Sequence, residues 1–465
     1  MQESVLFLNP PGKALYIRDY YCSKTSKAHY LPQPVDLLMQ SGHFYQAGFP
    51  VSVCDAIVER LSSEETLARI ERLEPALIIT MCGAVSFKED RSFFAALKDR
   101  LPQTRILASG DLFLDDPSGW LERLPWLSGI ITNWFCDGSL RYALGDDGGV
   151  RGLIYRRDGR VVHSPDPKGE KTVSLPMPRH ELFHGNPYRF AFADRYPMAT
   201  VLTTYACPYP CTFCIMSQLG FRTRPVAEVL QELRYLKRLG ISYLYFSDQT
   251  FFAVSEHSEE LLQAMIDEQL NFNWCCFSRV DRLDERKLTL MKRAGCNVVM
   301  FGVEWADDAL NAHYRKGYQV DQVRSTFALA RKVGLRTLGT FLLGVPGETE
   351  DSILQTINLA LELEADYASF NVAVPRARTA FREEALSREL VAPDPVVMDQ
   401  SGAGPGMGTG AVSASRVHAL KRRAYLRFYF RPTYLWRRLR GIGSLVELKT
   451  HVLEASHILK GLVTS

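Results

Sequence analysis

The chain has 465 residues, which suggests two to four domains rather than one. Hydrophobic residues make up 46% of it and charged residues 23%, a globular composition that excludes a mainly disordered, collagen-like or small disulfide-scaffold protein. The formal net charge of +3 is too small to create the strong field typical of nucleic-acid binding, so we expect no nucleic-acid partner. Ten cysteines are present, and three of them crowd into one short segment, which makes that segment the most informative feature.

The N-terminal residues have no basic region followed by a long apolar stretch and a cleavage site, so we expect no signal peptide. No apolar run of about 18 residues occurs, so we expect no transmembrane helix. These features indicate a cytoplasmic protein. Thiols stay reduced in that compartment, where clustered cysteines are more often metal ligands or catalytic groups than disulfides.

Strands and helices alternate over residues 1–145, which predicts an α/β domain with a doubly wound, Rossmann-like parallel sheet. The expected strands are 4–9, 49–56, 76–82 and 105–110, and the expected helices are 34–47, 64–73 and 88–101. Residues 146–192 are interpreted as a connector, which contains a hairpin at 152–163 and then a proline-rich stretch.

The alternation resumes over residues 193–391 with larger units. Six strands separated by helical patterns, the clearest at 226–239, predict a partial (βα)6 barrel whose chemistry lies at the carboxyl ends of its strands. Residues 392–415 are rich in Gly, Pro and Ser and predict a flexible loop, and 416–465 predict a basic helical region. The expected barrel strands are 199–204, 243–247, 272–277, 297–304, 336–344 and 367–374.

Cys207, Cys211 and Cys214 follow the first expected barrel strand with the spacing C-x3-C-x2-C. They are either three unrelated core residues or the ligands of a metal site. A structural zinc ion takes four protein ligands, and no nearby Cys or His supplies the fourth. Three thiolates suit a [4Fe–4S] cluster in which one iron stays open to bind a small substrate.

This spacing after the first strand of a partial barrel resembles the signature of the radical S-adenosylmethionine (SAM) family. The resemblance implies that the open iron binds the amino and carboxylate groups of SAM. It implies further that one electron, from a donor such as flavodoxin or ferredoxin, leads to a 5′-deoxyadenosyl radical that abstracts hydrogen from an unreactive carbon. Phe213, before the third cysteine, would then pack near the adenine, with simple core packing as the alternative.

The resemblance continues along the expected barrel strands. It implies that Asp248 accepts a hydrogen bond from the SAM amino group and that Arg279 binds the SAM carboxylate. Glu304 would bind the ribose hydroxyls. The alternatives are a helix N-cap for Asp248 and a surface ion pair for Arg279.

Residues 339–351 resemble the fifth-strand segment near the adenine, where glycines would permit close approach of the backbone and Thr349 would cap a helix. Arg376 stands where the family usually has glycine, a departure that would reshape the substrate pocket. The residues leave the catalytic group unknown. The remaining barrel cysteines, interpreted as small buried hydrophobic residues, are Cys275, Cys276 and Cys296.

The N-terminal domain resembles the cobalamin-binding domain found before many radical SAM barrels. Two motifs depart from that family: Ser109-Gly110-Asp111 replaces Gly-Gly-Pro, and WFCDG at 134–138 replaces a Gly-Glu pair. The alternative is a retained fold that has lost cobalamin and now shapes the active site. The candidate contacts lie at strand ends, where ligands bind in open α/β sheets, and are Asn9, Pro10, Gly12, Gly83, Ala84, Val85, Ser86, Ser109 and Gly110.

Residues 416–440 contain nine Lys or Arg and no acidic residue, with aromatic residues interleaved. One interpretation is an amphipathic helix that touches an anionic membrane or a lipid-like substrate, which would make the protein membrane-associated. Nucleic acid is a weaker interpretation. The alternative is a helical cap on the barrel with a solvated basic face.

Together these features predict a radical SAM enzyme that abstracts hydrogen from an unactivated carbon of a mid-sized apolar metabolite and methylates it with cobalamin. The rival hypothesis ends in oxidation, hydroxylation or ring rearrangement, in tetrapyrrole or isoprenoid-type biosynthesis. A remote alternative is a zinc-stabilised binding module without catalysis.

Overall fold

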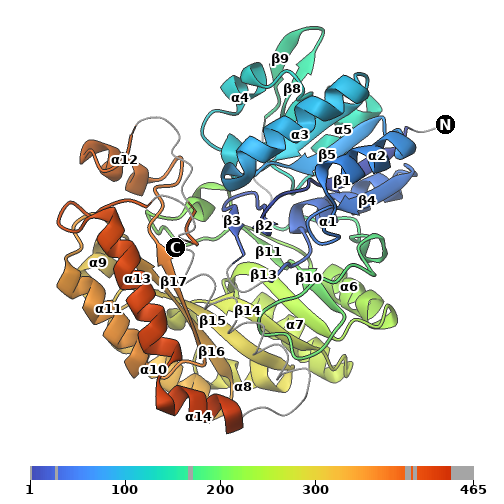
Figure 1. Cartoon of the computed structure of the whole chain (residues 1–465). Coiled ribbons are helices and arrows are strands. Elements are labelled where there is room, and N and C mark those ends of the chain that lie inside the picture. The colour runs from blue at the N-terminus through green and yellow to red at the C-terminus, as the bar shows by residue number, and fades with distance from the viewer. Residues whose placement is uncertain (1–2, 27–29, 166–170, 393–398, 402–405, 441–465) are drawn as a thin grey trace. The chain divides into compact units, whose positions relative to one another are not determined.

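The computed structural model describes residues 3–26, 30–165, 171–392, 399–401 and 406–440 (Figure 1). Its contacts divide the chain into two compact units. The N-terminal unit contains Met1–Ser26, Leu31–Tyr188 and Arg222–Leu239, and the second unit contains Lys27–Tyr30, Arg189–Phe221 and Gly240–Ser465. The expected helix at 226–239 forms as α6 (Val226–Arg238) but belongs to the N-terminal unit.

The N-terminal unit is built on a seven-stranded sheet of order β4-β1-β5-β6-β7-β8-β9. The first five strands are parallel, which confirms the doubly wound fold, and their order is the flavodoxin-like 2-1-3-4-5. The hairpin assigned to the connector instead extends this sheet as antiparallel β8 and β9. The strands are β1 (Val5–Asn9), β4 (Val51–Asp55), β5 (Leu77–Met81), β6 (Arg105–Ser109), β7 (Gly129–Ile131), β8 (Leu153–Arg157) and β9 (Arg160–His163).

Helices cover this sheet and bury its apolar strands. Every residue of β1 and β5 is buried, as expected for parallel strands covered on both faces. A reciprocal capping box between Ser62 and Glu65 begins α2, in agreement with the expected start of that helix. The helices are α1 (Val35–Gln46), α2 (Ser63–Leu73), α3 (Phe87–Arg100), α4 (Pro117–Arg123) and α5 (Gly138–Leu144), and a small hairpin joins β2 (Tyr16–Ile17) to β3 (Lys24–Thr25).

The second unit contains a six-stranded sheet of order β10-β13-β14-β15-β16-β17, in which all neighbours are parallel. Since β10 and β17 remain edge strands, the sheet is an open partial barrel, as predicted. Its strands are β10 (Met198–Val201), β13 (Tyr243–Phe251), β14 (Asn273–Ser278), β15 (Cys296–Glu304), β16 (Arg336–Leu343) and β17 (Tyr367–Val372). Its helices are α7 (Ser255–Asp267), α8 (Glu285–Arg293), α9 (Asp308–His313), α10 (Val320–Val333), α11 (Glu350–Glu362) and α12 (Ala380–Ser387).

The basic region begins with two helices, α13 (Ala414–Tyr429) and α14 (Pro432–Arg440). Helix α13 packs on β17 through buried Leu420, Ala424 and Phe428. The rest of the expected helical region, 441–465, lies outside the described residues. Within the described part of the chain, the structure contains no helix with the length and apolar character needed to cross a membrane.

Candidate active site

The cysteine segment begins just after β10 and is held by a buried carboxylate. Asp248, within β13, accepts hydrogen bonds from the backbone N–H of Thr203 (2.7 Å) and Thr204 (3.2 Å) and from the Thr203 hydroxyl. Burial raises the pKa of Asp248, and these donors oppose the rise. Because Asp248 lies in a strand, the helix N-cap alternative is wrong. Its contact with the SAM amino group stays a prediction, and the role visible here is to hold the segment that leads to Cys207.

The backbone is turned sharply where the cysteines begin. Ala206 has a left-handed conformation with φ of 62°, which is costly for a residue with a Cβ and is found mostly where function demands it. The Sγ atom of Cys207 lies 3.6 Å from the Thr250 hydroxyl, and Cys211 is buried. Burial raises the pKa of Cys211 and raises that of Cys214 to about 12, so binding of a metal cluster would have to displace their protons.

Cys207, Cys211 and Cys214 are the candidate metal ligands of this loop. Among the described residues, no group of three or more His, Cys, Asp or Glu side chains is arranged to hold a single metal ion. A zinc ion requires its ligands to meet at about 2.3 Å from one centre, whereas a [4Fe–4S] cluster spreads its thiolates over separate irons. Three thiolates on one loop are the donor set that a [4Fe–4S] cluster with one open iron takes.

Arg279 lies beside these thiols at the end of β14. Its Nη1 atom is 3.7 Å from the Cys211 sulfur, and its Nε and Nη2 atoms form a paired bond with Asp281 at 2.9 and 3.0 Å. Nη2 also donates to the Lys316 carbonyl at 2.6 Å, and the guanidinium stacks over the Tyr209 ring at 4.0 Å. Arg279 is 93% buried. The ion-pair alternative is therefore right about the partner, Asp281, but wrong about the surface, because the arginine is not exposed.

Glu304 ends β15 and is paired with a cation that the motifs did not identify. Its backbone is left-handed, with φ of 65°, and its Oε1 atom lies 2.8 Å from Nζ of Lys316. Both side chains are largely buried, at 12% and 8% exposure. Burial alone would lower the pKa of Lys316, but the Glu304 carboxylate keeps it above its ordinary value. The positive charges of Lys316 and Arg279 in turn oppose the raised pKa of Cys211.

Sequence reasoning missed Lys316 because no local pattern marks it. The residue lies in a loop after a six-residue helix, α9, and only the fold brings that loop to Glu304 and towards Cys211. The available signal was one of the two lysines, Lys316 and Lys332, between the fourth and fifth expected barrel strands, and a lysine in that position is too common to be informative.

Phe213 belongs to an aromatic cluster rather than standing alone. Its ring packs edge-on against Trp305 at 5.4 Å and against Tyr314 at 6.3 Å, between ring centroids. Lys316 Nζ lies 5.5 Å from the same ring. The packing alternative is therefore present, and contact of Phe213 with an adenine stays a prediction.

The loop after β16 is held by a second buried carboxylate. Glu348 accepts hydrogen bonds from the backbone N–H of Gly344 (2.6 Å) and Val345 (2.9 Å), and burial raises its pKa to about 7. Thr349 caps α11 as expected, by accepting from the Ser352 N–H. Arg376, the departure after the sixth strand, donates to the Gln400 side chain at 3.3 Å.

At the carboxyl edge of the N-terminal sheet, the candidate contacts surround a buried arginine. The Arg18 side chain has no exposed surface and pairs with Asp90 at 2.6 Å. It also donates to the Asn9 side chain (3.0 Å), the Pro10 carbonyl (2.8 Å) and the Ser86 hydroxyl (3.2 Å). Asn9 and Ser86 thus lie together at the switch point between β1 and β5, but their side chains already form hydrogen bonds with Arg18.

Asp111 ties the neighbouring loop to the small β2–β3 hairpin. Its carboxylate accepts from the Ser23 N–H (2.8 Å), the Ser23 hydroxyl (2.9 Å) and the Ala84 N–H (2.9 Å). This residue replaces the proline that the family commonly has. The replacement therefore has a structural effect, because proline could not accept these bonds.

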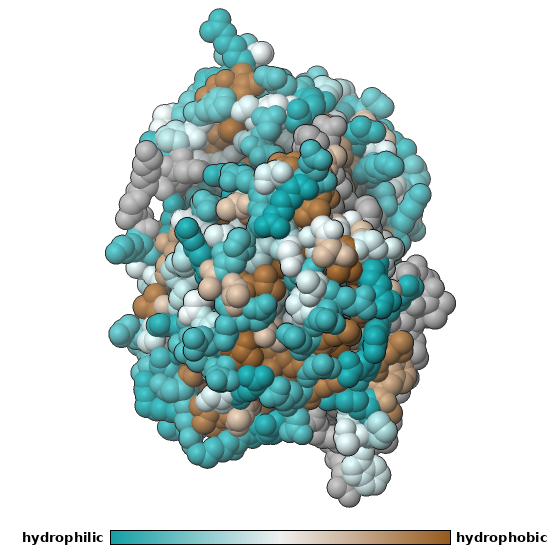
Figure 2. Space-filling view, turned by 90° about the vertical axis from the view of Figure 1, so that its left-hand side faces the viewer, coloured by the Kyte–Doolittle hydropathy of each residue, from teal (hydrophilic) through white to brown (hydrophobic). Residues whose placement is uncertain are grey.

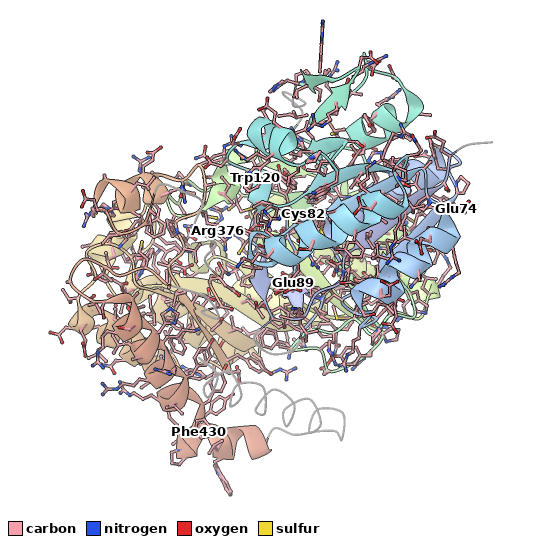
Figure 3. The ribbon with its side chains drawn as sticks, turned by 45° about the horizontal axis from the view of Figure 1, so that its top comes forward. Glu74, Cys82, Glu89, Trp120, Arg376 and Phe430 are labelled. Atoms are coloured by element: carbon pink, nitrogen blue, oxygen red, sulfur yellow. The ribbon has the colours of Figure 1, made fainter. Side chains whose placement is uncertain are left out.

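Three further candidates, Gly83, Ser109 and Gly110, are packed against the chain itself. A Cβ added to Gly110, whose φ is 142°, would lie 1.8 Å from the carbonyl oxygen of Cys82, a residue labelled in Figure 3. A Cβ on Gly83 would lie 2.8 Å from the Ser23 side chain. The hydroxyl of Ser109 donates to Asp36 at 3.3 Å. These glycines are thus required for packing, and their contact with cobalamin stays a prediction.

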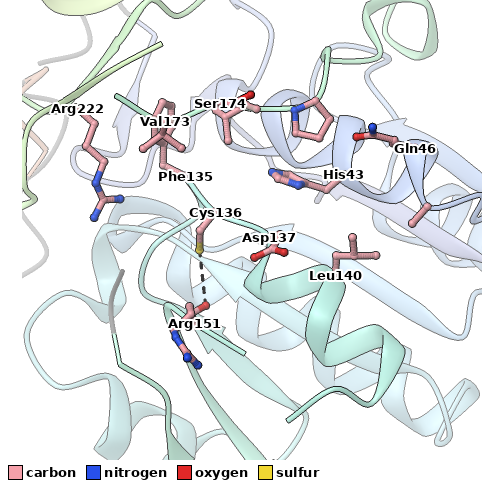
Figure 4. A pocket seen from close by; sticks show the side chains of 13 residues that line it. His43, Gln46, Phe135, Cys136, Asp137, Leu140, Arg151, Val173, Ser174 and Arg222 are labelled. Carbon is pink, nitrogen blue, oxygen red and sulfur yellow. Dashed lines mark hydrogen bonds between the residues drawn. The ribbon is translucent and has the colours of Figure 1, made fainter. Parts of the chain in front are cut away.

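The N-terminal unit also contains a pocket of about 510 Å³ between α1, the start of α5 and residues 173–176 (Figure 4). Its wall includes Phe135 and Leu140, and His43 and Asp137 lie at one end. Burial lowers the pKa of His43 to about 4, and its Nε2 atom has no hydrogen-bond partner among the described residues. None of the predicted contacts lines this pocket.

Comparison with known proteins agrees with this site. Residues 201–360, which include the three cysteines, match the family model of the radical SAM superfamily. The chain is 27% identical over 402 residues to an uncharacterized methyltransferase, PH0819, of Pyrococcus horikoshii, covering 83% of this chain and 85% of that protein. It is 23% identical over 412 residues to the anaerobic magnesium-protoporphyrin IX monomethyl ester cyclase of Synechocystis sp., covering 85% and 80%.

Among solved structures, the chain resembles the radical S-adenosylmethionine methyltransferase TsrM of Kitasatospora setae, described with cobalamin and a [4Fe–4S] cluster bound. The TM-score is 0.70 at 17% sequence identity, with all of both chains covered, so both units share that fold. Residues 201–360, which hold the cysteine segment and the strands that follow it, thus match the radical SAM superfamily, in a chain that shares the fold of that structure.

Proposed function

We propose that this chain is a cobalamin-dependent radical SAM enzyme that methylates an unactivated carbon of a mid-sized apolar metabolite. The proposal rests above all on one observation: three cysteines, Arg279 and the Lys316–Glu304 pair gather where parallel strands end, in a chain that also has a doubly wound unit. When bound, the [4Fe–4S] cluster and SAM supply a radical that abstracts hydrogen, and methylcobalamin supplies the methyl group.

In this proposal the residues of the second unit would bind the cluster and SAM and orient them. Cys207, Cys211 and Cys214 hold three irons as thiolates. Arg279 is fixed by Asp281 and by the Lys316 carbonyl, which leaves one Nη1 hydrogen not bonded to the described residues and available to a carboxylate. Two buried cations suit a site that must hold three thiolates and a negatively charged cluster.

The N-terminal sheet fits cobalamin in its topology and less well in its predicted contacts. Its strand order opens a crevice between the carboxyl ends of β1 and β5, where ligands bind in such sheets. However, Asn9, Ser86 and Ser109 already use their side chains within the chain. The groups left partly exposed near this edge belong to the segment that covers it, and include Tyr16, Asp19 and Tyr21.

Methylation is favoured by the relatives that span both units. PH0819, which is described as a methyltransferase, aligns over most of both chains, and TsrM is described as a methyltransferase with cobalamin bound. An apolar metabolite is favoured by the aromatic residues Phe213, Trp305 and Tyr314 beside the cysteine segment. Flavodoxin or ferredoxin is the proposed electron donor.

A second candidate function is oxidative cyclisation or another radical reaction without methyl transfer. It is favoured by the similarity to the monomethyl ester cyclase, which covers nearly as much of both chains as PH0819 does. Asp111 also stands where the cobalamin-binding resemblance would have proline.

Isotope labelling separates the two functions. A strain lacking this protein would be complemented with the intact chain or with Cys211→Ser and grown on methionine carrying a deuterated methyl group. Methylation predicts a metabolite that appears only with the intact chain and carries the label. An unlabelled product that differs by oxygen or by hydrogen loss would reject methylation in favour of oxidation. Absorption of the protein purified from cells fed hydroxocobalamin reports separately whether a corrinoid is bound.

A further inference from the structure

Helix α13 has an inner face that seals the edge of the six-stranded sheet. The Tyr425 hydroxyl accepts from the Phe370 N–H (3.2 Å), and the Tyr429 hydroxyl donates to the Ala368 carbonyl (2.8 Å) and accepts from its N–H (3.1 Å). These groups of β17 would otherwise form an open strand edge. The Tyr434 hydroxyl likewise donates to the Asp366 carbonyl. These three tyrosines of the basic region therefore have a structural role.

Helices α13 and α14 and the turn between them also carry large apolar side chains that are exposed. Leu426, Phe430, Leu435 and Trp436 are 48%, 47%, 46% and 59% exposed. They are four of the eight large hydrophobic residues that are exposed in the described part of the chain, and all four fall within 426–436. Figure 3 labels Phe430 at the end of α13. On the face shown in Figure 2, hydrophobic surface is interspersed with hydrophilic side chains.

Exposed arginines accompany these apolar residues. Arg422 and Arg423 are exposed on α13, one helical turn before Leu426, and Arg427 is partly exposed beside it. No acidic residue occurs between 416 and 440, so the residues of these two helices contribute only positive charge to this surface. We define the basic-apolar face as Arg422, Arg423, Leu426, Phe430, Leu435 and Trp436.

We propose that the basic-apolar face docks on the surface of an anionic phospholipid bilayer. The negative surface potential of such a bilayer attracts arginines, and apolar side chains beside them are stabilised by entering the interface. Tryptophan and tyrosine prefer that depth, where one end of the ring is wet and the other apolar. A second copy of the chain fits less well, because a symmetric contact would oppose like charges. Nucleic acid would leave Leu426 and Leu435 in water.

Vesicle flotation of the full chain tests the proposal. Vesicles of phosphatidylcholine alone would be compared with vesicles containing about 30% phosphatidylglycerol, and we expect binding at least about tenfold tighter to the second. Two double variants divide the face: Arg422→Glu with Arg423→Glu, and Phe430→Ser with Trp436→Ser. Each should weaken binding at least about tenfold. The matched controls are Arg160→Glu and Leu144→Ser, which change exposed residues of the N-terminal unit and should leave binding unchanged.

The outcomes separate the possible occupants of this face. Equal binding to neutral vesicles, or undiminished binding by either double variant, would overturn the proposal. So would concentration-dependent dimerisation without vesicles that Phe430→Ser with Trp436→Ser abolishes, since the face would then belong to a second copy. Binding of single-stranded RNA that the arginine variant abolishes, with no vesicle binding, would assign the face to nucleic acid. Because the changed residues point away from the core, thermal unfolding should stay unaltered in all four variants.

Discussion

The two parallel sheets of this chain place chemically active side chains at the same kind of edge and use them in opposite ways. At the carboxyl edge of the N-terminal sheet, Arg18 binds Asp90, Asn9 and Ser86, so each polar group has a partner in the chain. In the second unit, Cys211 lies near two cations, Arg279 and Lys316, and burial raises the pKa values of the Cys211 and Cys214 thiols.

This difference shows what strand topology does and does not determine. Topology decides that side chains from separate loops meet at one edge. These side chains bind one another if the chain itself supplies their hydrogen-bond and ion-pair partners, and they are available to a ligand if it does not. The β2–β3 hairpin supplies it in the N-terminal unit, where Ser23 and Arg18 occupy the edge. Among the described residues, no carboxylate or side-chain amide forms a hydrogen bond with the three cysteine sulfurs in the way that Asp90 and Asn9 do with Arg18.

The largest expected effect is loss of the cluster. After anaerobic reconstitution, the intact chain should contain about four iron and four sulfide per chain. Cys211→Ser should retain only a small fraction of that content, because two cysteines cannot hold a site-differentiated cluster. Cys276→Ala, at a buried position in β14, is the matched control and should keep the full content. Iron and sulfide assays with the absorption spectrum measure both. One zinc per chain and no sulfide in the unaltered protein would instead revive a zinc site.

The next largest effect is expected at the N-terminal edge. Arg18→Met leaves the Asp90 carboxylate buried without its cation, which should lower the free energy of unfolding by about 3–5 kcal/mol. The control is Arg100→Met, whose pair with Glu64 is exposed and should be worth at most about 1 kcal/mol. Urea unfolding measures both, and amide exchange of residues 5–26 should locate the loss in this unit. Equal small losses for the two variants would mean that the edge is not held by Arg18.

Hydrophobic periodicity and the glycine, proline and polar residues that end each segment predict the six-stranded sheet and four strands of the N-terminal sheet, β1, β4, β5 and β6, but not β7. All six barrel strands lie within a few residues of their expected positions, because each is an apolar run bounded by glycine or polar turns. The cysteine segment was predictable because its spacing is local. Lys316, Thr250 and Arg18 were not, because each meets its partner only after distant segments have packed together. The hairpin β8–β9 was assigned to the connector because sequence alone does not say which sheet an antiparallel pair will join.

A third prediction uses pH to probe the crowded N-terminal edge. Burial raises the pKa of Asp55 to about 6, although Asn9, Tyr188 and Val58 donate hydrogen bonds to it. The folded protein therefore binds more protons than the unfolded chain between about pH 4 and 6, and its stability falls as pH rises through that window. Asp55→Asn should remove this loss and raise the free energy of unfolding at pH 7.5 by about 2 kcal/mol, with little change at pH 4.

Asp158→Asn is the matched control for that prediction, because its side chain is 93% exposed and should show no such pH dependence. Urea midpoints at the two pH values give the answer. If Asp55→Asn destabilised the chain equally at both, the carboxylate would be ionised and well solvated in the folded state, and the edge would be more open than its hydrogen bonds indicate.

The smallest expected effect tests the cations of the second unit. Lys316 lies near Cys211 and pairs with Glu304, so Lys316→Met removes a positive charge and leaves a buried carboxylate facing the cysteine segment. Both changes disfavour adding an electron to a cluster held there, which should lower its midpoint potential by on the order of 1 kcal/mol in free energy. Lys316→Arg should restore most of that shift, whereas Lys332→Met, at an exposed ion pair, should cause none. A redox titration monitored by electron paramagnetic resonance reads the potential independently of turnover. An unchanged potential in Lys316→Met, with normal iron content, would show that the lysine charge does not act on the cluster and that Lys316 only packs against Phe213 and Tyr318. Arg279 alone would then supply the positive charge beside the cysteines that distinguishes this edge from the N-terminal one.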